Sequence, residues 1–374
     1  MKRLCEFFPL RDWEQMSGFL REAYRPDLAL RHRPIFEWQF MADRHGGNAS
    51  MICAYEGDAL IGIHGYLALP MFWGNVEQPI VGGWGINLYA KPEFRSGLGW
   101  VLLKKLKEMY PVSIGVGASE QAERILVGKD WVFHPRVPRY LGILDLERAL
   151  QMANPGDSRQ NLKPMKFHRT MAPAKIWKLT ESSSQYQPRW HEYPAMAFGT
   201  IRSLDYLRWR YLRHPVFRYS AWAIGVPERP AVCVFRIEHA FGDCEARVAR
   251  VVEFFHPNDA EGESQGVELI RAVSARLTLE GCVYADFIGS SSAYGKTLVE
   301  AGWIEEGDRQ TLPVRLSPVE RKPRYQNLTF TVARGLPSPN LESMYVTRSD
   351  GDEDRAARMP VSAWAFGSIV ERKR

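Results

Sequence analysis

The stretch Gly82-Gly83-Trp84-Gly85-Ile86-Asn87-Leu88-Tyr89-Ala90-Lys91-Pro92-Glu93-Phe94-Arg95-Ser96-Gly97-Leu98-Gly99-Trp100 decides the fold of the first third of the chain. It begins as an apolar strand, turns at Pro-Glu-Phe-Arg, and opens an amphipathic helix with two glycines at its entrance. The first turn of a helix carries unpaired N–H groups and partial positive charge, and glycine lets a phosphate approach closely. With Arg95 beside it, this entrance predicts a pyrophosphate cradle. A turn that needs glycine only for packing is the alternative.

Size and charge narrow the class of protein. The chain has 374 residues, more than the roughly 250–300 at which single cores usually stop growing, so two domains are expected. Its 45% hydrophobic and 25% charged residues are typical of a soluble globular protein. The net charge of +6 favours small anionic ligands and permits peripheral attachment to an acidic membrane. The chain has no basic run interleaved with aromatic residues, so a nucleic-acid partner is not expected.

The cysteines and the N-terminus indicate the compartment. The five cysteines are scattered, odd in number and form no CxxC pair, which favours free thiols. The N-terminal segment becomes charged too soon for a signal peptide, and no apolar run reaches the ~18 residues of a membrane helix. We therefore expect a cytoplasmic protein without an integral membrane segment. The oligomeric state is left open.

The second half of the chain repeats the plan of the first. Trp38-Gln-Phe40 has a counterpart in Trp209-Arg-Tyr211, 171 residues later, and Trp131 has one in Trp303, 172 residues later. Each half also predicts a hairpin, a strand, a helix and another strand in that order, at 51–69, 82–90, 99–110 and 112–117, then 220–238, 248–255, 266–279 and 282–288. Matching anchors at nearly constant spacing predict a tandem duplication. Because the strands form hairpins and also alternate with helices, the fold class is α/β with mixed sheets.

The strand, the arginine, the Gly-x-Gly and the helix together resemble the acyl-CoA pyrophosphate loop of the GNAT acyltransferase superfamily. Arg95 stands two residues before the first glycine, where the family pattern has three. The resemblance implies two tandem GNAT-like domains, with acyl-CoA (acetyl-CoA or longer) as co-substrate and no metal. It also implies that two neighbouring strands separate and hold pantetheine on the backbone of Leu88 and Tyr89. The pyrophosphate would lie on Arg95, Ser96, Gly97, Leu98 and Gly99.

The second copy of the repeat lacks a counterpart of this pyrophosphate loop. Its corresponding loop carries Asp259, Glu261 and Glu263, which would repel a pyrophosphate. We therefore predict that residues 1–150 form the acyl-CoA-binding domain and that 175–340 form a domain shaping the acceptor pocket. Residues 151–174 connect them, and 341–374 form a tail.

The catalytic groups are less clear than the donor site. Many GNAT enzymes place a carboxylate on the strand entering the cradle and a tyrosine on a later helix, but here those positions hold Asn87 and, nearby, Leu126. Proton transfer would then fall to other residues or to ordered water. The candidates within or beside predicted strands are His64, Asn87, Glu120, Glu253 and Asp286. Each also has an ordinary structural explanation.

The tail sharpens the functional prediction. Thr347-Arg-Ser-Asp-Gly-Asp-Glu-Asp-Arg355 lacks the distal glutamate of a calcium loop. It resembles a segment of tandem GNAT-like proteins associated with bacterial surface-sugar biosynthesis. That resemblance implies an N-acyltransferase acting on an amino sugar, with small-molecule partners. The alternatives are a Fem-like aminoacyl transferase and a non-catalytic CoA- or nucleotide-binding protein. Arg208, Arg210 and Arg213 could meet acceptor phosphates, or could form a solvated helix face.

Overall fold

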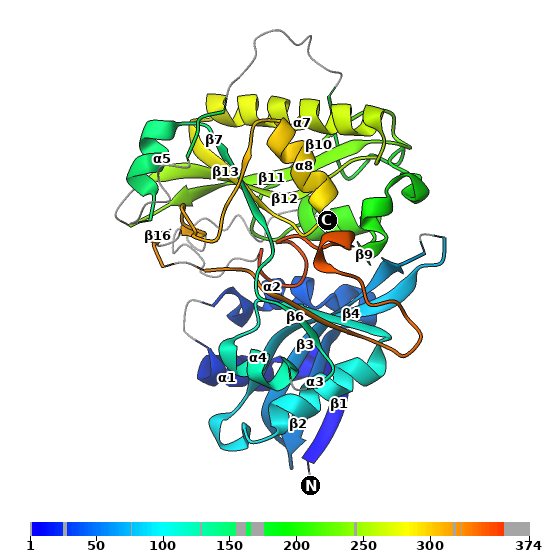
Figure 1. The fold of residues 1–374 in the computed structure, drawn as a ribbon. Helices are drawn as coiled ribbons and strands as arrows, with labels where there is room; N and C mark the ends of the chain where they lie inside the picture. Colours follow the sequence, from blue (N-terminus) through cyan, green and yellow to red (C-terminus); the bar gives the residue numbers. More distant parts are fainter. Residues whose placement is uncertain are drawn as a thin grey trace.

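The computed structural model describes residues 2–24, 28–75, 77–127, 129–154, 162–165, 176–242, 245–316, 319–322 and 324–354. Most of the predicted connection, Cys244 and Arg355 lie outside these ranges. Two mixed sheets lie one above the other, each flanked by helices, which confirms the α/β class (Figure 1). Within the described ranges, no helix combines the length and the apolar character that crossing a membrane requires.

Counted over the described residues, the first sheet has nine strands. Seven run in the order β1-β2-β3-β4-β5-β17-β6, while β9 pairs with β3 and β18 pairs with β9. The pair β4–β5 is parallel and β3–β4 is antiparallel, so the sheet is mixed. The strands are β1 (Lys2–Pro9), β2 (Asn48–Glu56), β3 (Ala59–Trp73), β4 (Ile80–Ala90), β5 (Val112–Val116), β6 (Val132–His134), β9 (Phe198–Thr200), β17 (Leu328–Val332) and β18 (Met344–Tyr345).

Helices cover both faces of this sheet. They are α1 (Trp13–Ala23), α2 (Arg33–Gln39), α3 (Leu98–Met109) and α4 (Glu120–Val127). A Cβ on Gly62 would meet Leu98 and Leu102 of α3, whereas a Cβ on Gly65 would meet Phe40, directly after α2. Residues three apart on a strand point to opposite faces, so α3 and α2 lie on opposite sides of β3.

In the part of the chain that the structure describes, the second sheet has seven strands in the order β14-β7-β13-β12-β11-β10-β8. The long helix α7 and the shorter α8 lie on one face of it (Figure 1). Its strands are β7 (Arg139–Ile143), β8 (Trp177–Lys178), β10 (Ser220–Ile224), β11 (Ala231–Ala240), β12 (Ala246–Phe255), β13 (Cys282–Ile288) and β14 (Ile304–Glu305). The helices are α5 (Leu146–Met152), α6 (Leu204–Leu207), a π-helical turn η8 (Arg208–Leu212), α7 (Ala260–Leu279) and α8 (Ser292–Glu300). A small ribbon pairs β15 (Arg315–Leu316) with β16 (Val319–Glu320).

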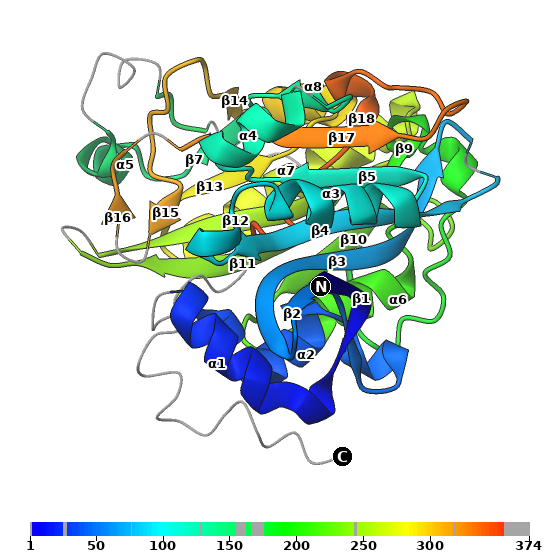
Figure 2. The same cartoon turned by 90° about the horizontal axis from the view of Figure 1, so that it is seen from below.

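The two halves exchange strands. The strand β7, from the end of the first half, pairs with β13 in the second sheet. The strand β17, from the end of the second half, lies between β5 and β6 in the first sheet, and Figure 2 shows it beside β5. Bounds drawn as continuous segments, 1–150 and 175–340, therefore cut across both sheets. One buried apolar cluster contains residues of both sheets, including Trp84 and Phe254.

The anchors of the predicted duplication occupy equivalent places. Trp38 Nε1 donates to the Trp209 carbonyl at 2.9 Å, and Trp209 Nε1 donates to the Trp38 carbonyl at 3.0 Å. Their ring centroids are 5.9 Å apart. The residues before the other two anchors, Asp130 (φ 60°) and Gly302 (φ 102°), both have left-handed backbone. This reciprocal contact relates the two halves by a local pseudo-twofold axis.

Candidate functional site

The entrance of α3 is open. Gly97 is its N-cap residue, with φ 97° in the left-handed region, and the described residues form no side-chain cap hydrogen bond there. A Cβ on Gly97 or on Gly99 would meet no atom within 4 Å. The positive φ favours glycine at position 97, because other L-residues are strained there. Among the described residues, the space beside Gly97 and Gly99 at the start of α3 is therefore open, as a phosphate site at a helix N-terminus requires.

Arg95 lies beside this entrance, on the turn that follows η4 (Pro92–Phe94). Its Nε donates to the Ala90 carbonyl at 3.3 Å, and its guanidinium lies 5.7 Å from the ring centroid of Tyr89. The side chains of Arg95 and Ser96 are exposed. These contacts hold the Arg95 charge next to the helix entrance while leaving it accessible to an anion.

β4 and β5 separate just before the entrance. Their parallel pairing ends at Gly85 opposite Gly115, although β4 continues to Ala90. On the other edge of β4, Tyr89 still pairs with Ile63 of β3. We call the stretch beyond Gly85 and Gly115 the strand split. It contains the backbone of Leu88 and Tyr89, whose role toward pantetheine stays a prediction.

Asn87 lies at a bulge in the strand split. Its φ of 53° is left-handed, an uncommon conformation that asparagine tolerates better than most residues. Gln39 Nε2 donates to Asn87 Oδ1 at 3.1 Å, and the Tyr24 hydroxyl donates to its carbonyl at 3.5 Å. Gln39 is 1% exposed, and its Oε1 has no hydrogen-bond partner among the described residues. Sequence reasoning missed Gln39, because nothing in the helical pattern of α2 distinguishes it.

His64 and Glu120 are not brought together with Asn87. His64 is buried on β3, with Nδ1 3.4 Å from the Leu102 carbonyl of α3, so it lies on the face opposite α2. Burial lowers the pKa of His64 to about 4, against the raising effect of that carbonyl, which keeps the ring neutral near pH 7. Glu120 is exposed at the start of α4. Their catalytic roles stay predictions without a contact that supports them.

Glu253 is buried in a hydrogen-bonded cluster. It pairs with Arg202 at 2.7 Å and accepts the hydroxyls of Tyr211 and Tyr345 at 2.5 and 2.6 Å. Ser349 Oγ also lies 2.9 Å from its Oε1. Burial raises the pKa of Glu253, although Arg202 acts in the opposite direction. These contacts give the carboxylate a structural role, and its catalytic role stays a prediction.

Asp286 is likewise enclosed. Its Oδ2 lies 2.8 Å from Arg139, 2.5 Å from Arg250 and 2.9 Å from Arg348. Burial alone would raise the pKa of Asp286, but the three guanidinium groups hold it well below its usual range. A carboxylate that stays ionised against three arginines is a poor proton acceptor, and its predicted role as a base stays without structural support.

The acidic tail segment 344–354 is packed into the molecule. Arg348 pairs with Asp286, Asp350 pairs with Arg202 at 2.7 Å, and Asp354 pairs with Arg236 at 2.9 Å. These pairs are buried. Segment 344–354 is therefore held in place by buried ion pairs and has a structural role.

The three arginines near Trp209 contact protein groups. Arg210 is buried and donates to the Gly351 carbonyl at 3.3 Å. Arg208 donates to the Glu181 carbonyl at 2.7 Å, and Arg213 to the Glu181 carboxylate at 2.9 Å. Their predicted contact with acceptor phosphates gains no support from these positions.

The entrance of α7 is closed where that of α3 is open. Asp259 is the N-cap residue, and its carboxylate accepts the Gly262 N–H at 2.8 Å. Arg229 forms ion pairs with Asp259, Glu192 and Glu261. The chain's own carboxylates therefore occupy the place that a phosphate would take.

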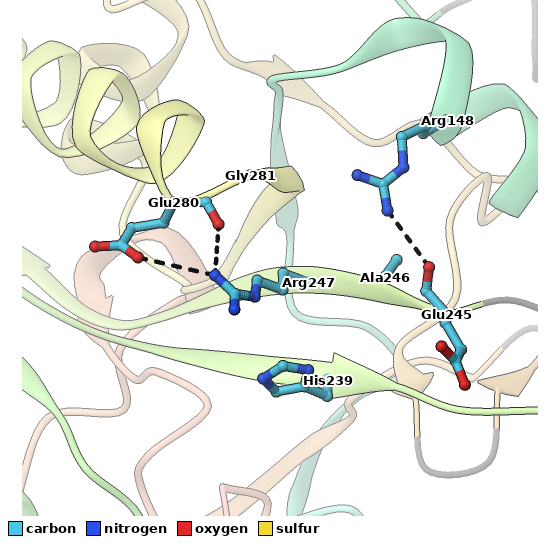
Figure 3. Close-up of a pocket in the computed structure, with 7 residues that line it drawn as sticks. All are labelled: Arg148, His239, Glu245, Ala246, Arg247, Glu280 and Gly281. Atoms are coloured by element: carbon cyan, nitrogen blue, oxygen red, sulfur yellow. Dashed lines mark hydrogen bonds and ion pairs between the residues drawn. The ribbon is translucent and has the colours of Figure 1, made fainter.

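A surface pocket of about 360 Å³ lies beside the second sheet, at the end of α7 opposite its entrance (Figure 3). It is lined by residues at the start of β12 and the end of α7, and Arg247 donates to the Glu280 carbonyl at 3.0 Å. Arg148 donates to the Glu245 carbonyl at 3.4 Å. Its arginines already contact backbone and carboxylate groups, and we assign it no part in the site.

Solved structures share this fold at low sequence identity. A GCN5-related N-acetyltransferase from Kribbella flavida matches with a TM-score of 0.52 and 12% identity, over 92% of this chain and 73% of that one. Another from Anabaena variabilis matches with 0.53 and 11%, over 89% and 73%. Saccharomyces cerevisiae N-myristoyltransferase with bound myristoyl-CoA matches with 0.51 and 10%, over 92% and 88%.

No protein-family model matches the chain. No curated protein matches it either. Because the sequence identity is so low, these structural matches establish the fold alone. The chain has the fold of the GCN5-related N-acetyltransferases, in two GNAT-like units.

Proposed function

We propose that the protein is an acyltransferase that moves an acyl group from acyl-CoA to the amino group of a sugar. The proposal rests above all on the coincidence of the open α3 entrance with the strand split. The entrance supplies backbone donors for the pyrophosphate of the donor, and the split leaves β4 backbone free to pair with an extended pantetheine chain. The yeast N-myristoyltransferase of similar fold binds myristoyl-CoA, which agrees with this donor class.

The acceptor is inferred from the resemblance of the tail to proteins of bacterial surface-sugar biosynthesis. An amino sugar linked to a nucleotide and destined for surface polysaccharide is the acceptor we propose. It would approach from the face of the first sheet that carries α2, where Asn87 and Gln39 lie. The Asn87 side chain would then orient the acceptor nitrogen or a water molecule. The Fem-like alternative predicts that transfer depends on aminoacyl-tRNA.

Binding and turnover test the proposal separately. Calorimetric titration with acetyl-CoA, and then with longer acyl-CoAs, is expected to give saturable binding with one site per chain. Release of free CoA thiol is then followed in the presence of free and nucleotide-linked amino sugars, with acylated product identified by mass. Absence of binding to every acyl-CoA would overturn the proposal. Binding without turnover of any acceptor favours a non-catalytic CoA-binding protein. Transfer from an added aminoacyl-tRNA that is abolished by RNase treatment favours the Fem-like enzyme.

A further inference from the structure

The strand split has two facing edges, which we call the β4 lip (at Asn87) and the β5 lip (at Gly117). Gly85 of β4 pairs with Gly115 of β5, and pairing stops there. Two residues further on each strand stand Asn87 and Gly117. Gly117 has φ 69°, so both lips have left-handed backbone where the strands diverge. On the β4 lip, the buried Oε1 of Gln39 lacks a partner among the described residues, and a buried oxygen of this kind needs a donor from water or ligand.

The tail crosses the base of this split. A Cβ on Gly351 would lie 2.9 Å from Val116 Cγ2, 3.6 Å from Ile86 Cγ2 and 3.9 Å from Trp84 Cε3. These three residues belong to β4 and β5 at the point of separation. The backbone of Gly351 therefore touches the first sheet, although its neighbours are bound to the second unit.

Two residues later, the tail brings a carboxylate to the β5 lip. A Cβ on Gly117 would collide with Glu353 Oε1, so this oxygen lies directly against the Gly117 backbone. Glu353 is partly exposed. Within the described part of the tail, flanking residues are held by buried ion pairs, Asp350 by Arg202 and Asp354 by Arg236. Arg236 and the Tyr219 hydroxyl lower the pKa of Asp354 to about 2 in spite of its burial, so this anchor stays ionised.

We propose that Glu353 is the proton acceptor of the acyl-transfer reaction. This inference rests on the proposed function, and it supplies the carboxylate that β4 lacks at Asn87. The acceptor nitrogen forms a bond to the thioester carbonyl carbon, and the carbon–sulfur bond breaks with its electron pair on sulfur. One proton leaves the nitrogen for the Glu353 carboxylate and passes on to the thiolate. The products are the amide and CoA thiol, and Glu353 returns to its ionised form.

The test compares Glu353→Gln with Glu342→Gln, an exposed glutamate earlier in the same tail. Glu353→Gln is expected to bind acetyl-CoA within twofold of the wild type, because glutamine has the same size as glutamate and the α3 entrance is unchanged. Its kcat, measured as thiol release with amino-sugar acceptors, is expected to fall by about 100-fold or more, as is usual when a general base is removed. The acid limb of its kcat/KM–pH profile is expected to disappear. Glu342→Gln is expected to match the wild type in all three measurements.

Glu353→Asp keeps the charge but withdraws it by one methylene, and it is expected to retain more activity than Glu353→Gln and to keep the acid limb. It also gives an answer if Glu353→Gln fails to fold. Wild-type turnover in Glu353→Gln, with an unchanged pH profile, would overturn the inference and leave the acyltransferase proposal intact. A wild-type protein that binds no acyl-CoA would overturn both, so the two failures are distinguishable.

Discussion

The two helix entrances differ in what meets their first turn. At α3 the N-cap is Gly97, the described residues form no side-chain cap hydrogen bond, and the space beside Gly97 is open. At α7 the N-cap is Asp259, whose carboxylate accepts a first-turn N–H, and Arg229 neutralises the acids around it. Both entrances follow a strand in equivalent units. A helix entrance can bind a ligand's phosphate only if the chain leaves its N–H groups free, so the choice of N-cap residue separates the two copies.

The strand splits differ in the same way. In each unit, parallel pairing stops before the strand ends, at Gly85 of β4 and at Val251 of β12. The second split is filled by the chain itself, since Glu253 there is bound by Arg202 and by the hydroxyls of two tyrosines. In the second unit, the features that we propose hold a donor in the first make structural contacts instead.

The largest expected effect comes from breaking this internal network. Asp286→Ala leaves Arg139, Arg250 and Arg348 without their shared carboxylate, and breaking a buried ion pair in this way costs about 3–5 kcal/mol. Urea denaturation at pH 7 measures the free energy of unfolding. Glu261→Ala, which removes an exposed partner of Arg229, is the control and should cost at most about 1 kcal/mol. Equal losses in the two variants would contradict the structural role of Asp286.

The sign of the pH dependence follows from the lowered pKa of Asp286. A carboxylate with a depressed folded-state pKa stabilises the protein above its unfolded pKa of about 3.9, and this contribution is lost as the pH falls toward the folded value. The wild type is therefore expected to lose its advantage over Asp286→Ala below about pH 4. A difference that stays constant from pH 7 to pH 3 would contradict this explanation.

The second prediction converts the open entrance into the closed one. Gly97→Asp places a carboxylate at the α3 entrance, where its charge repels phosphate, so acetyl-CoA affinity is expected to fall by about 100-fold or more, or about 2.7 kcal/mol. Calorimetry measures the dissociation constant. The matched control is Gly335→Asp, because Gly335 has a similar φ of 93° and equally open surroundings. Asp259→Ala should leave binding unchanged and cost about 1 kcal/mol of stability. Unchanged affinity in Gly97→Asp would remove the donor site from the α3 entrance.

Local patterns in the sequence predicted the individual elements well. The apolar run into Gly-x-Gly gave β4 and α3, and the repeated Trp-x-aromatic segments gave the duplication that the Trp38–Trp209 contact now supports. The exchange of β7 and β17 could not be predicted, because a strand's composition does not say which of two similar sheets it joins. The first strand, β1, was missed because its pairing with β2 depends on tertiary context.

The candidate site was predictable only where backbone chemistry defines it. Glycines at a helix entrance have a direct physical meaning, so the open entrance of α3 could be predicted, and its role as a pyrophosphate cradle stays a prediction. Gln39 and Glu353 were not, since each gains significance from one distant neighbour, Asn87 or Gly117. Conversely, Asp286 was a catalytic candidate because it is an acid within an apolar strand. The arginines that pair with it come from three other segments of the chain, and no local pattern indicates such partners.

The third prediction concerns the irregular pairing of β3 with β4, where His64 lies. The corresponding irregularity of the second copy, in the pairing of β11 with β12, falls between Val234 and Phe235. Burial lowers the pKa of His64 to about 4 in the folded protein, whereas an unfolded histidine takes up a proton near pH 6.5. As the pH falls from about 6.5 toward 4, the unfolded state alone gains this proton, so the folded protein loses stability. His64→Leu should therefore flatten the pH dependence of stability and reduce the wild-type loss at pH 5 by about 2 kcal/mol. Denaturation at pH 7 and pH 5 measures this. If thiol release by the variant fell 100-fold at unchanged stability, His64 would be catalytic after all.

The smallest effect tests the pseudo-twofold contact itself. Trp38→Phe and Trp209→Phe each remove one indole donor and leave the facing carbonyl without it, at a cost of about 1–2 kcal/mol. If the contact is symmetric, the two losses in unfolding free energy should agree within about 0.5 kcal/mol, and the double variant should show coupling because the rings touch. A much larger loss for one tryptophan would mean that the copies have diverged here too. In that case the two units would share an architecture at this interface without sharing its energetics, just as they share helix entrances of opposite chemistry.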